Sequence, residues 1–288
     1  MFTRLIQGIS GAKRGEQLSV FLSFFALFFL LTSYYLVKPL RESRFLLHFD
    51  PESLAYFMLV TPILAFIVTK FFSFWVGRIP RYRLMVITFS IVMLCKLAFF
   101  IILPISGRWA SGLYFFWASV YFTLVLSILW AVFNTLFKAE QAERCFGFVA
   151  LGATMGSISG SKISAWLSES PLKDWALLVA LCAMLLSLGL TLWNIRVSEA
   201  EQQKSDTKKN AGKAVGRGWD DVSQVLTNPY VKGIAMMVFG LAFVGTMVNL
   251  QVYPQIDQGI ATQAYQKTFA EIDVDKTHFY TASEVLIF

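Results

Sequence analysis

The chain has 288 residues, of which 56% are hydrophobic, 16% are aromatic and only 15% are charged. A water-soluble domain could hardly reach this balance, so the composition favours a membrane protein built from helices. The excess of 25 Lys and Arg over 18 Asp and Glu gives a net charge of +7, which we attribute to cytoplasmic loops rather than to nucleic-acid binding.

Seven stretches of the sequence reach the roughly 20 apolar residues that a helix needs to cross the bilayer core. The first exceeds the ~7–15 apolar residues of a signal peptide, and no small-residue cleavage site follows it, so we expect it to be retained. Tryptophans near the ends of several stretches indicate the headgroup level. The predicted spans are Leu18–Val37, Leu54–Phe74, Leu84–Ile105, Ser111–Phe137, Cys145–Trp166, Trp175–Ile195 and Pro229–Val252.

Basic loops predict the orientation and the division of the chain. Most Lys and Arg residues fall on the side that contains the N-terminus, so we expect a multi-pass protein of a bacterial inner membrane with a cytoplasmic N-terminus. The predicted parts are a tail (1–17), a six-helix transmembrane bundle (18–196), a polar cytoplasmic linker (197–228) and a further helix that starts a second bundle (229–288).

This order of six spans, a linker and a further span is typical of transporters built from two repeated halves. An apolar run begins at Phe279 and stops at Phe288, which predicts an unfinished eighth helix and hence a truncated chain. The expected fold class is all-α, with a six-helix bundle of the major facilitator type followed by the start of a second bundle.

A basic cluster at the end of the first span opposes the general charge pattern. Tyr34, Lys38 and Arg41 fall on one face of a helix if that helix continues past Pro39, and the face then points into the bundle. Proline could instead end the helix and leave a basic loop outside the membrane. We favour the first interpretation, because charges within membrane helices usually mark substrate paths.

Lys96 lies near the middle of the third span, where a charge costs at least ~2.5–3.5 kcal/mol on insertion scales. The alternatives to a binding role are a structural pair and a side chain that reaches back to the interface. None of the 18 acidic residues falls within the predicted spans. Cations without acids favour an anionic substrate and disfavour proton coupling within this half.

Asn134 lies one turn inside the end of the fourth span, where it could hydrogen-bond to a ligand or to another helix. In the fifth span Gly152, Gly156 and Gly160 recur every four residues, which predicts close helix packing. A tight basic turn between the second and third spans is an orientation signal and a candidate conformational loop. Its key residues are Gly77, Arg78, Arg81 and Arg83.

The sequence offers little support for a metal site or a cofactor. Cys95, Cys145 and Cys182 form no CxxC pair, and His48 and His278 have no neighbouring second ligand, so we expect neither a metal site nor a cofactor. No base or nucleophile lies within the spans, and we therefore expect no catalytic residue.

The segments Tyr35–Arg44 and Trp130–Gly160 resemble the ATP/ADP translocase family of NTP/NDP exchange transporters. The turn Gly77–Arg83 is similar to the loop motif of major facilitator transporters, although the acidic residue of that motif is missing. The resemblance implies twelve helices in two bundles, nucleotide exchange, and phosphate binding by Lys38 and Arg41. Lys96 is not part of the resemblance.

We therefore expect a membrane transporter, not an enzyme, that carries a small organic anion by alternating access, with a nucleotide as the leading candidate. Its site residues would be Tyr34, Lys38, Arg41, Lys96 and Asn134. Three alternatives stay open: a major facilitator transporter of another phosphorylated or carboxylated solute, an intramembrane enzyme that acts on phosphorylated lipid, and a membrane interaction protein without transport.

Overall fold

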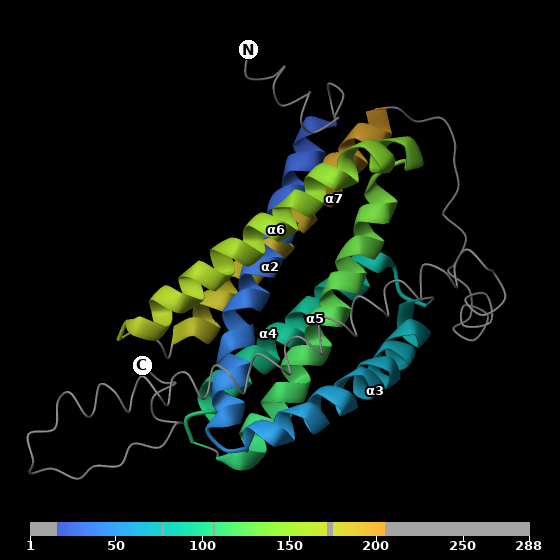
Figure 1. Ribbon diagram of the computed structural model, residues 1–288. Coiled ribbons are helices and arrows are strands. Elements are labelled where there is room, and N and C mark those ends of the chain that lie inside the picture. Colours follow the sequence, from blue (N-terminus) through green and yellow to red (C-terminus); the bar gives the residue numbers. More distant parts are fainter. Residues whose placement is uncertain (1–15, 77, 106, 172–174, 205–288) are drawn as a thin grey trace, which may run out of the picture. The chain divides into compact units, whose positions relative to one another are not determined.

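The computed structural model describes residues 16–76, 78–105, 107–171 and 175–204, and within these ranges the chain is helical, without strands (Figure 1). This confirms the all-helical class for the described part. The predicted seventh span and most of the linker lie outside it. The helices are α2 (Gln17–Leu46), α3 (Pro51–Val76), α4 (Arg81–Ile102), α5 (Arg108–Leu136), α6 (Ala139–Glu169) and α7 (Ala176–Lys204).

Four of the helices, α2, α4, α5 and α7, are long and apolar enough to cross a membrane. The chain is therefore a multi-pass integral membrane protein. The second and fifth predicted spans are also helical, but they differ from the other four. The apolar stretch of α3 is the shorter segment Tyr56–Phe72, and α6 is rich in glycine and serine, which lowers its hydropathy.

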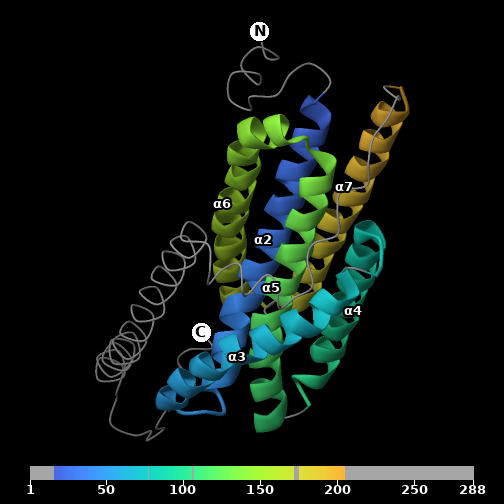
Figure 2. The same ribbon diagram turned by 90° about the vertical axis from the view of Figure 1, so that its right-hand side faces the viewer.

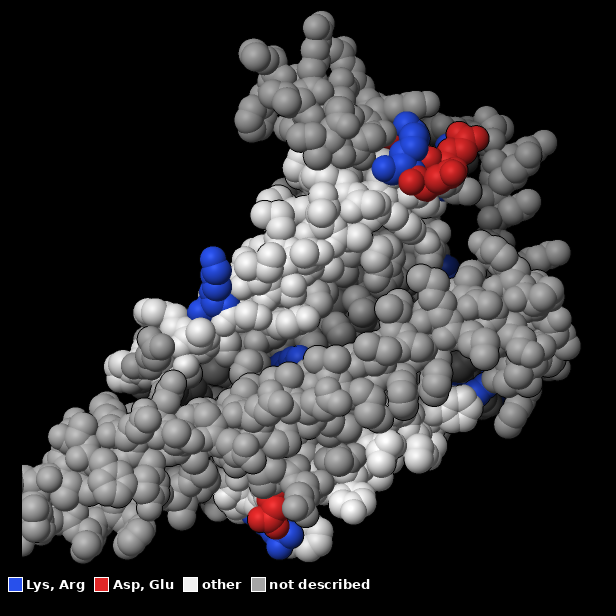
Figure 3. Space-filling model, in the orientation of Figure 1, with Lys and Arg blue, Asp and Glu red and all other residues white. Residues whose placement is uncertain are grey.

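The outer surface of these helices suits a lipid environment. On α4 the side chains of Ile91, Leu94 and Ile101 are more than half exposed, as expected where hydrocarbon replaces water as the solvent. Figure 3 shows that the described residues on this face are largely uncharged, with a few separate groups of Lys, Arg, Asp and Glu side chains.

The chain divides into two compact units. In its described part, the first contains α2 as far as Glu42 together with α4, α5, α6 and α7, whereas the second contains residues 43–74. In the second unit, the rings of Phe45, Phe49 and Phe57 form a cluster with centroid separations of 4.6 to 5.2 Å. The basic residues discussed below belong to the first unit.

Within the first unit, α2 lies between α6 and α7 (Figure 2). It packs against α6 in parallel, with a contact every four residues, and we call this the α2–α6 seam. A Cβ atom added to Gly156 would overlap a backbone carbonyl oxygen of α2, so only glycine permits this approach. The hydroxyl of Thr32 also donates to the Gly156 carbonyl at 3.1 Å. The contacting pairs are Phe24 with Gly152, Phe28 with Gly156, and Thr32 with Gly160.

Against α7, helix α2 runs antiparallel, and hydrogen bonds join the two helices every seven residues. We call this the α2–α7 seam. A seven-residue period is typical of helices that cross at a shallow angle. Buried Asn194 extends the seam with a second bond, from its Nδ2 to Ser23 Oγ at 2.8 Å. The repeating pairs are Ser19 with Asn194 (2.5 Å), the Ala26 carbonyl with Ser187 (2.8 Å), and Ser33 with the Ala180 carbonyl (2.6 Å).

Candidate functional site

Helix α2 continues through Pro39 and ends only at Leu46. The predicted first span stops at Val37, so the helix is longer than the hydropathy alone indicates. Pro39 is exposed and removes one backbone donor, but the following turns remain helical. As a result the basic cluster belongs to the helix and not to a loop, and Arg41 is directed into the first unit.

Arg41 is only 8% exposed. Its Nη1 donates to Ser119 Oγ on α5 at 2.7 Å, and its Nη2 pairs with the Glu42 carboxylate at 2.8 Å. The guanidinium also lies 4.7 Å from the centroid of the Phe115 ring, a distance typical of cation–π contact. Glu42 therefore neutralises one of the predicted cations, which the count of acids within the spans did not reveal.

Lys96 of α4 is fully buried, with 0% of its surface exposed. Its Nζ donates to Ser33 Oγ on α2 at 2.6 Å and lies 5.1 Å from the centroid of the Tyr121 ring on α5. No carboxylate of the described residues pairs with it. Of the two alternatives to a binding role, the first was a side chain that extends to the interface, and Lys96 does not do so. The second was a structural pair, and here the partner of Lys96 is a hydroxyl rather than an acid.

The two buried cations approach α5 within one helical turn, Arg41 from α2 and Lys96 from α4. Their contacts, Ser119 and Tyr121, are two residues apart, which corresponds to about 3 Å along the helix axis and about 200° around it, so the two cations meet α5 at the same level but on different sides. Arg41 Nε and Tyr121 Oη are buried and have no hydrogen-bond partner among the described residues. We call Arg41, Lys96, Ser33, Ser119 and Tyr121 the buried basic cluster.

Tyr34 and Lys38 lie beside this cluster on α2. The Tyr34 ring stacks on Phe122 of α5 with a centroid separation of 3.7 Å. Lys38 is half-buried, with its Nζ 5.9 Å from the centroid of the Tyr35 ring. Tyr34 and Arg41 therefore lie on the face of α2 toward α5, whereas the ammonium group of Lys38 lies over the Tyr35 ring.

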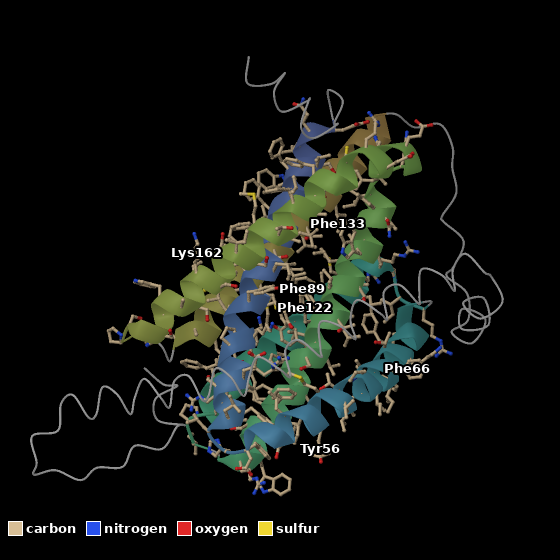
Figure 4. All side chains as sticks on the ribbon, viewed as in Figure 1. Tyr56, Phe66, Phe89, Phe122, Phe133 and Lys162 are labelled. Atoms are coloured by element: carbon tan, nitrogen blue, oxygen red, sulfur yellow. The ribbon has the colours of Figure 1, made fainter. Side chains whose placement is uncertain are left out.

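Aromatic rings surround the cluster on the α4 and α5 side. Trp117 stacks on Tyr121 at a centroid separation of 4.6 Å and contacts Phe99 at 5.0 Å. Figure 4 shows Phe89, Phe122 and Phe133 among the packed helices, whereas Lys162 projects outward from α6. The cations are therefore enclosed by rings and hydroxyls.

Asn134 does not join the cluster. It is exposed in the last turn of α5, 13 residues beyond Tyr121, or about 20 Å along the helix axis. Its buried neighbour on the helix is Phe133. Of the five predicted substrate-binding residues, the structure thus brings Tyr34, Arg41 and Lys96 together, places Lys38 beside them, and separates Asn134.

The basic turn before α4 lies at a helix end, distant along α4 from Lys96. Gly77 is outside the described residues, and Arg78 is exposed. Arg81 donates from Nη1 to the Ala131 carbonyl at a long 3.4 Å, whereas Arg83 Nε donates to Tyr82 Oη at 2.9 Å.

Sequence reasoning missed Ser33, Ser119 and Tyr121. Serine and tyrosine are ordinary in apolar helices, where a hydroxyl can bond to a carbonyl of its own helix. Ser33 is, however, one of the α2 serines spaced by multiples of seven residues, Ser19 and Ser33. That spacing was the available signal, and it identifies a seam rather than a ligand contact.

Comparisons of the chain with protein-family models, with curated proteins and with solved structures gave no match. Function has to be inferred from the residues of the first unit themselves.

Proposed function

We propose that the protein is a secondary transporter of an organic anion, with a nucleotide as the leading candidate, and that the buried basic cluster contacts the anion during alternating access. The observation that carries this proposal is Lys96, a fully buried lysine without a carboxylate partner among the described residues. An ionisable residue at this depth is costly to bury and usually marks a functional site.

The charge balance supports an anionic substrate. The cations Lys38, Arg41 and Lys96 are opposed here by one carboxylate, that of Glu42. An anion that entered between α2, α4 and α5 would compensate the remaining positive charge, because charged partners interact more strongly away from water. Arg41 Nε and Tyr121 Oη would gain a partner in the same step.

The chemical nature of the cluster favours phosphate or carboxylate oxygens. A guanidinium and an ammonium form short, charge-assisted hydrogen bonds to such oxygens. Aromatic rings lie next to the cations, but Tyr34 already stacks on Phe122 and Trp117 on Tyr121, so a nucleotide base would have to replace one of these ring contacts. The resemblance of residues 35–44 and 130–160 to ATP/ADP translocases supports a nucleotide as the first candidate.

Exchange measurements in proteoliposomes test this proposal. Vesicles that contain the purified protein are loaded with unlabelled ADP, and uptake of labelled ATP, ADP or inorganic phosphate is followed. We expect saturable uptake, reduced at least about tenfold in Lys96→Met, because one lost charge-assisted bond corresponds to roughly 1.5–3 kcal/mol. Lys38→Ala should also lower uptake.

The matched control is Lys162→Met, which removes a lysine that projects outward from α6 (Figure 4). It should retain the uptake of the unchanged protein. Absence of saturable flux for all three solutes would contradict the proposal. Flux that is unchanged in both Lys38→Ala and Lys96→Met would contradict the role of these cations.

A further inference from the structure

A second polar site lies in the first unit, away from the buried basic cluster. It is a pocket of about 280 Å³ where the start of α4 meets the ends of α5 and α7. Its lining combines a guanidinium and hydroxyls with apolar side chains. The residues on which the following argument depends are Arg81, Tyr82, Val132, Thr135, Ile195 and Ser198.

The position of the pocket relative to the membrane spans is defined by its lining. Arg81 is the first residue of one candidate span, Leu136 is the last of another, and Ser198 is the last of a third. Three spans therefore reach the same bilayer surface at this pocket. Residues at the limits of the spans lie at the level of the lipid headgroups.

The electrostatic character of the pocket is cationic. Arg81 makes one long hydrogen bond, to the Ala131 carbonyl at 3.4 Å, and pairs with no carboxylate among the described residues. Arg83 makes two contacts with Tyr82. Its Nε donates to the phenol oxygen at 2.9 Å, and its guanidinium lies 5.7 Å from the ring centroid. Most donors of Arg81 thus have no partner in this part of the chain.

We propose that this pocket binds the phosphate of an anionic phospholipid from the adjacent leaflet. The planar fork of Arg81 matches two phosphate oxygens. The hydroxyl of Ser198 supplies a further donor, whereas that of Thr135 already donates to the Val132 carbonyl at 2.6 Å. Val132 and Ile195 would face the glycerol and the first acyl carbons. A lipid is favoured over a soluble phosphate because the pocket lies at headgroup level, where basic side chains attract anionic lipids.

Thermal unfolding of the delipidated full chain in detergent tests this site. Phosphatidylglycerol, phosphatidylcholine and soluble glycerol 3-phosphate are titrated separately, and the midpoint shift gives an apparent affinity for each. We expect phosphatidylglycerol to stabilise the protein, phosphatidylcholine to act more weakly and glycerol 3-phosphate to have no comparable effect. Arg81→Gln should weaken the response to phosphatidylglycerol about tenfold or more.

The matched control is Arg108→Gln, because Arg108 is also the exposed first residue of a candidate span. It should respond like the unchanged protein. If Arg81→Gln does not fold, Arg81→Lys and Ser198→Ala replace it, and each should show a weaker response. An unchanged response in all Arg81 and Ser198 variants overturns the site, and an equal effect of glycerol 3-phosphate overturns the lipid as its occupant.

Discussion

Ser33 connects the buried lysine to the α2–α7 seam. Its hydroxyl oxygen accepts a hydrogen bond from Lys96 Nζ at 2.6 Å, and its hydroxyl hydrogen is donated to the Ala180 carbonyl at 2.6 Å. One oxygen therefore links α4, α2 and α7. Removal of such a group leaves buried polar atoms without partners, which costs more than the net value of the bonds.

The substitution Ser33→Ala should destabilise the protein by about 1–3 kcal/mol, because Lys96 Nζ and the Ala180 carbonyl each lose a partner. Reversible unfolding in detergent and denaturant measures this change. Ser161→Ala is the control, since that exposed hydroxyl bonds only to Ser157 O within its own helix. Equal effects of the two substitutions would contradict the role of Ser33.

Double substitution separates the lysine from the seam. Lys96→Met in the Ser33→Ala background should recover part of the lost stability, because no buried ammonium then remains unpartnered. Fully additive losses in the same unfolding measurement would show that Lys96 does not depend on Ser33.

At the residue scale the sequence identified the residue type that is rare in a membrane helix, a lysine, and missed the common ones, serine and tyrosine. Lys96 stands out by charge and depth alone. Glu42 and Ser119, the partners of Arg41, became apparent only with the helix that continues past Pro39 and with its packing on α5. Asn134 was chosen for its amide, but the side it occupies on α5 depends on tertiary packing. The role of all five predicted substrate-binding residues stays a prediction.

Gly156 of α6 and Gly189 of α7 differ sharply in their surroundings. A Cβ on Gly156 would overlap the Phe28 carbonyl, whereas a Cβ on Gly189 would meet no atom within 4 Å outside the neighbouring backbone of its own helix. Both lie inside helices, where alanine is intrinsically favoured over glycine by about 1 kcal/mol. The same substitution therefore has opposite expected signs at the two positions.

Gly156→Ala should lower stability by about 1–3 kcal/mol through overpacking against α2. Gly189→Ala should raise it by up to about 1 kcal/mol through helix propensity. Thermal unfolding in detergent compares the two variants directly. Tolerance of Gly156→Ala would mean that α2 and α6 separate more easily than the structure indicates.

At the element scale, periodicity within one helix is visible in the sequence, but register between helices is not. The four-residue spacing of Gly152, Gly156 and Gly160 could be found by inspection. The α2–α7 seam cannot be found within one helix, because Ser187 and Asn194 form its hydrogen bonds with partners more than 150 residues away. The small residues of α6 lower its hydropathy, so it is absent from the four helices that are apolar enough to cross a membrane, although its apolar stretch was visible in the sequence.

For the whole molecule, the membrane topology can be tested with single cysteines. In a background without Cys95, Cys145 and Cys182, Glu140→Cys is expected to lie on the cytoplasmic side and Gly107→Cys on the opposite side. An impermeant maleimide should label Gly107→Cys in intact spheroplasts and Glu140→Cys in inverted vesicles. Labelling of both residues from one face would contradict the orientation and the number of intervening crossings.

The overall class was predictable because composition and hydropathy depend on whether water or lipid surrounds the protein surface. The order of the first six helices followed from the same signal, with α2 extended by residues 38–46. Which helices pack against one another did not follow, because hydropathy does not reveal the partners of residues such as Gly156 and Ser187. The expected major facilitator arrangement of two halves remains a prediction.

The two seams of α2 have one consequence for assembly. A slip of four residues preserves the spacing of the α2–α6 seam, and a slip of seven preserves that of the α2–α7 seam. The smallest slip that satisfies both is 28 residues, nearly the 30-residue length of the helix. A shorter shift of α2 along its axis against both neighbours would therefore break at least one seam, which opposes sliding of α2 between α6 and α7.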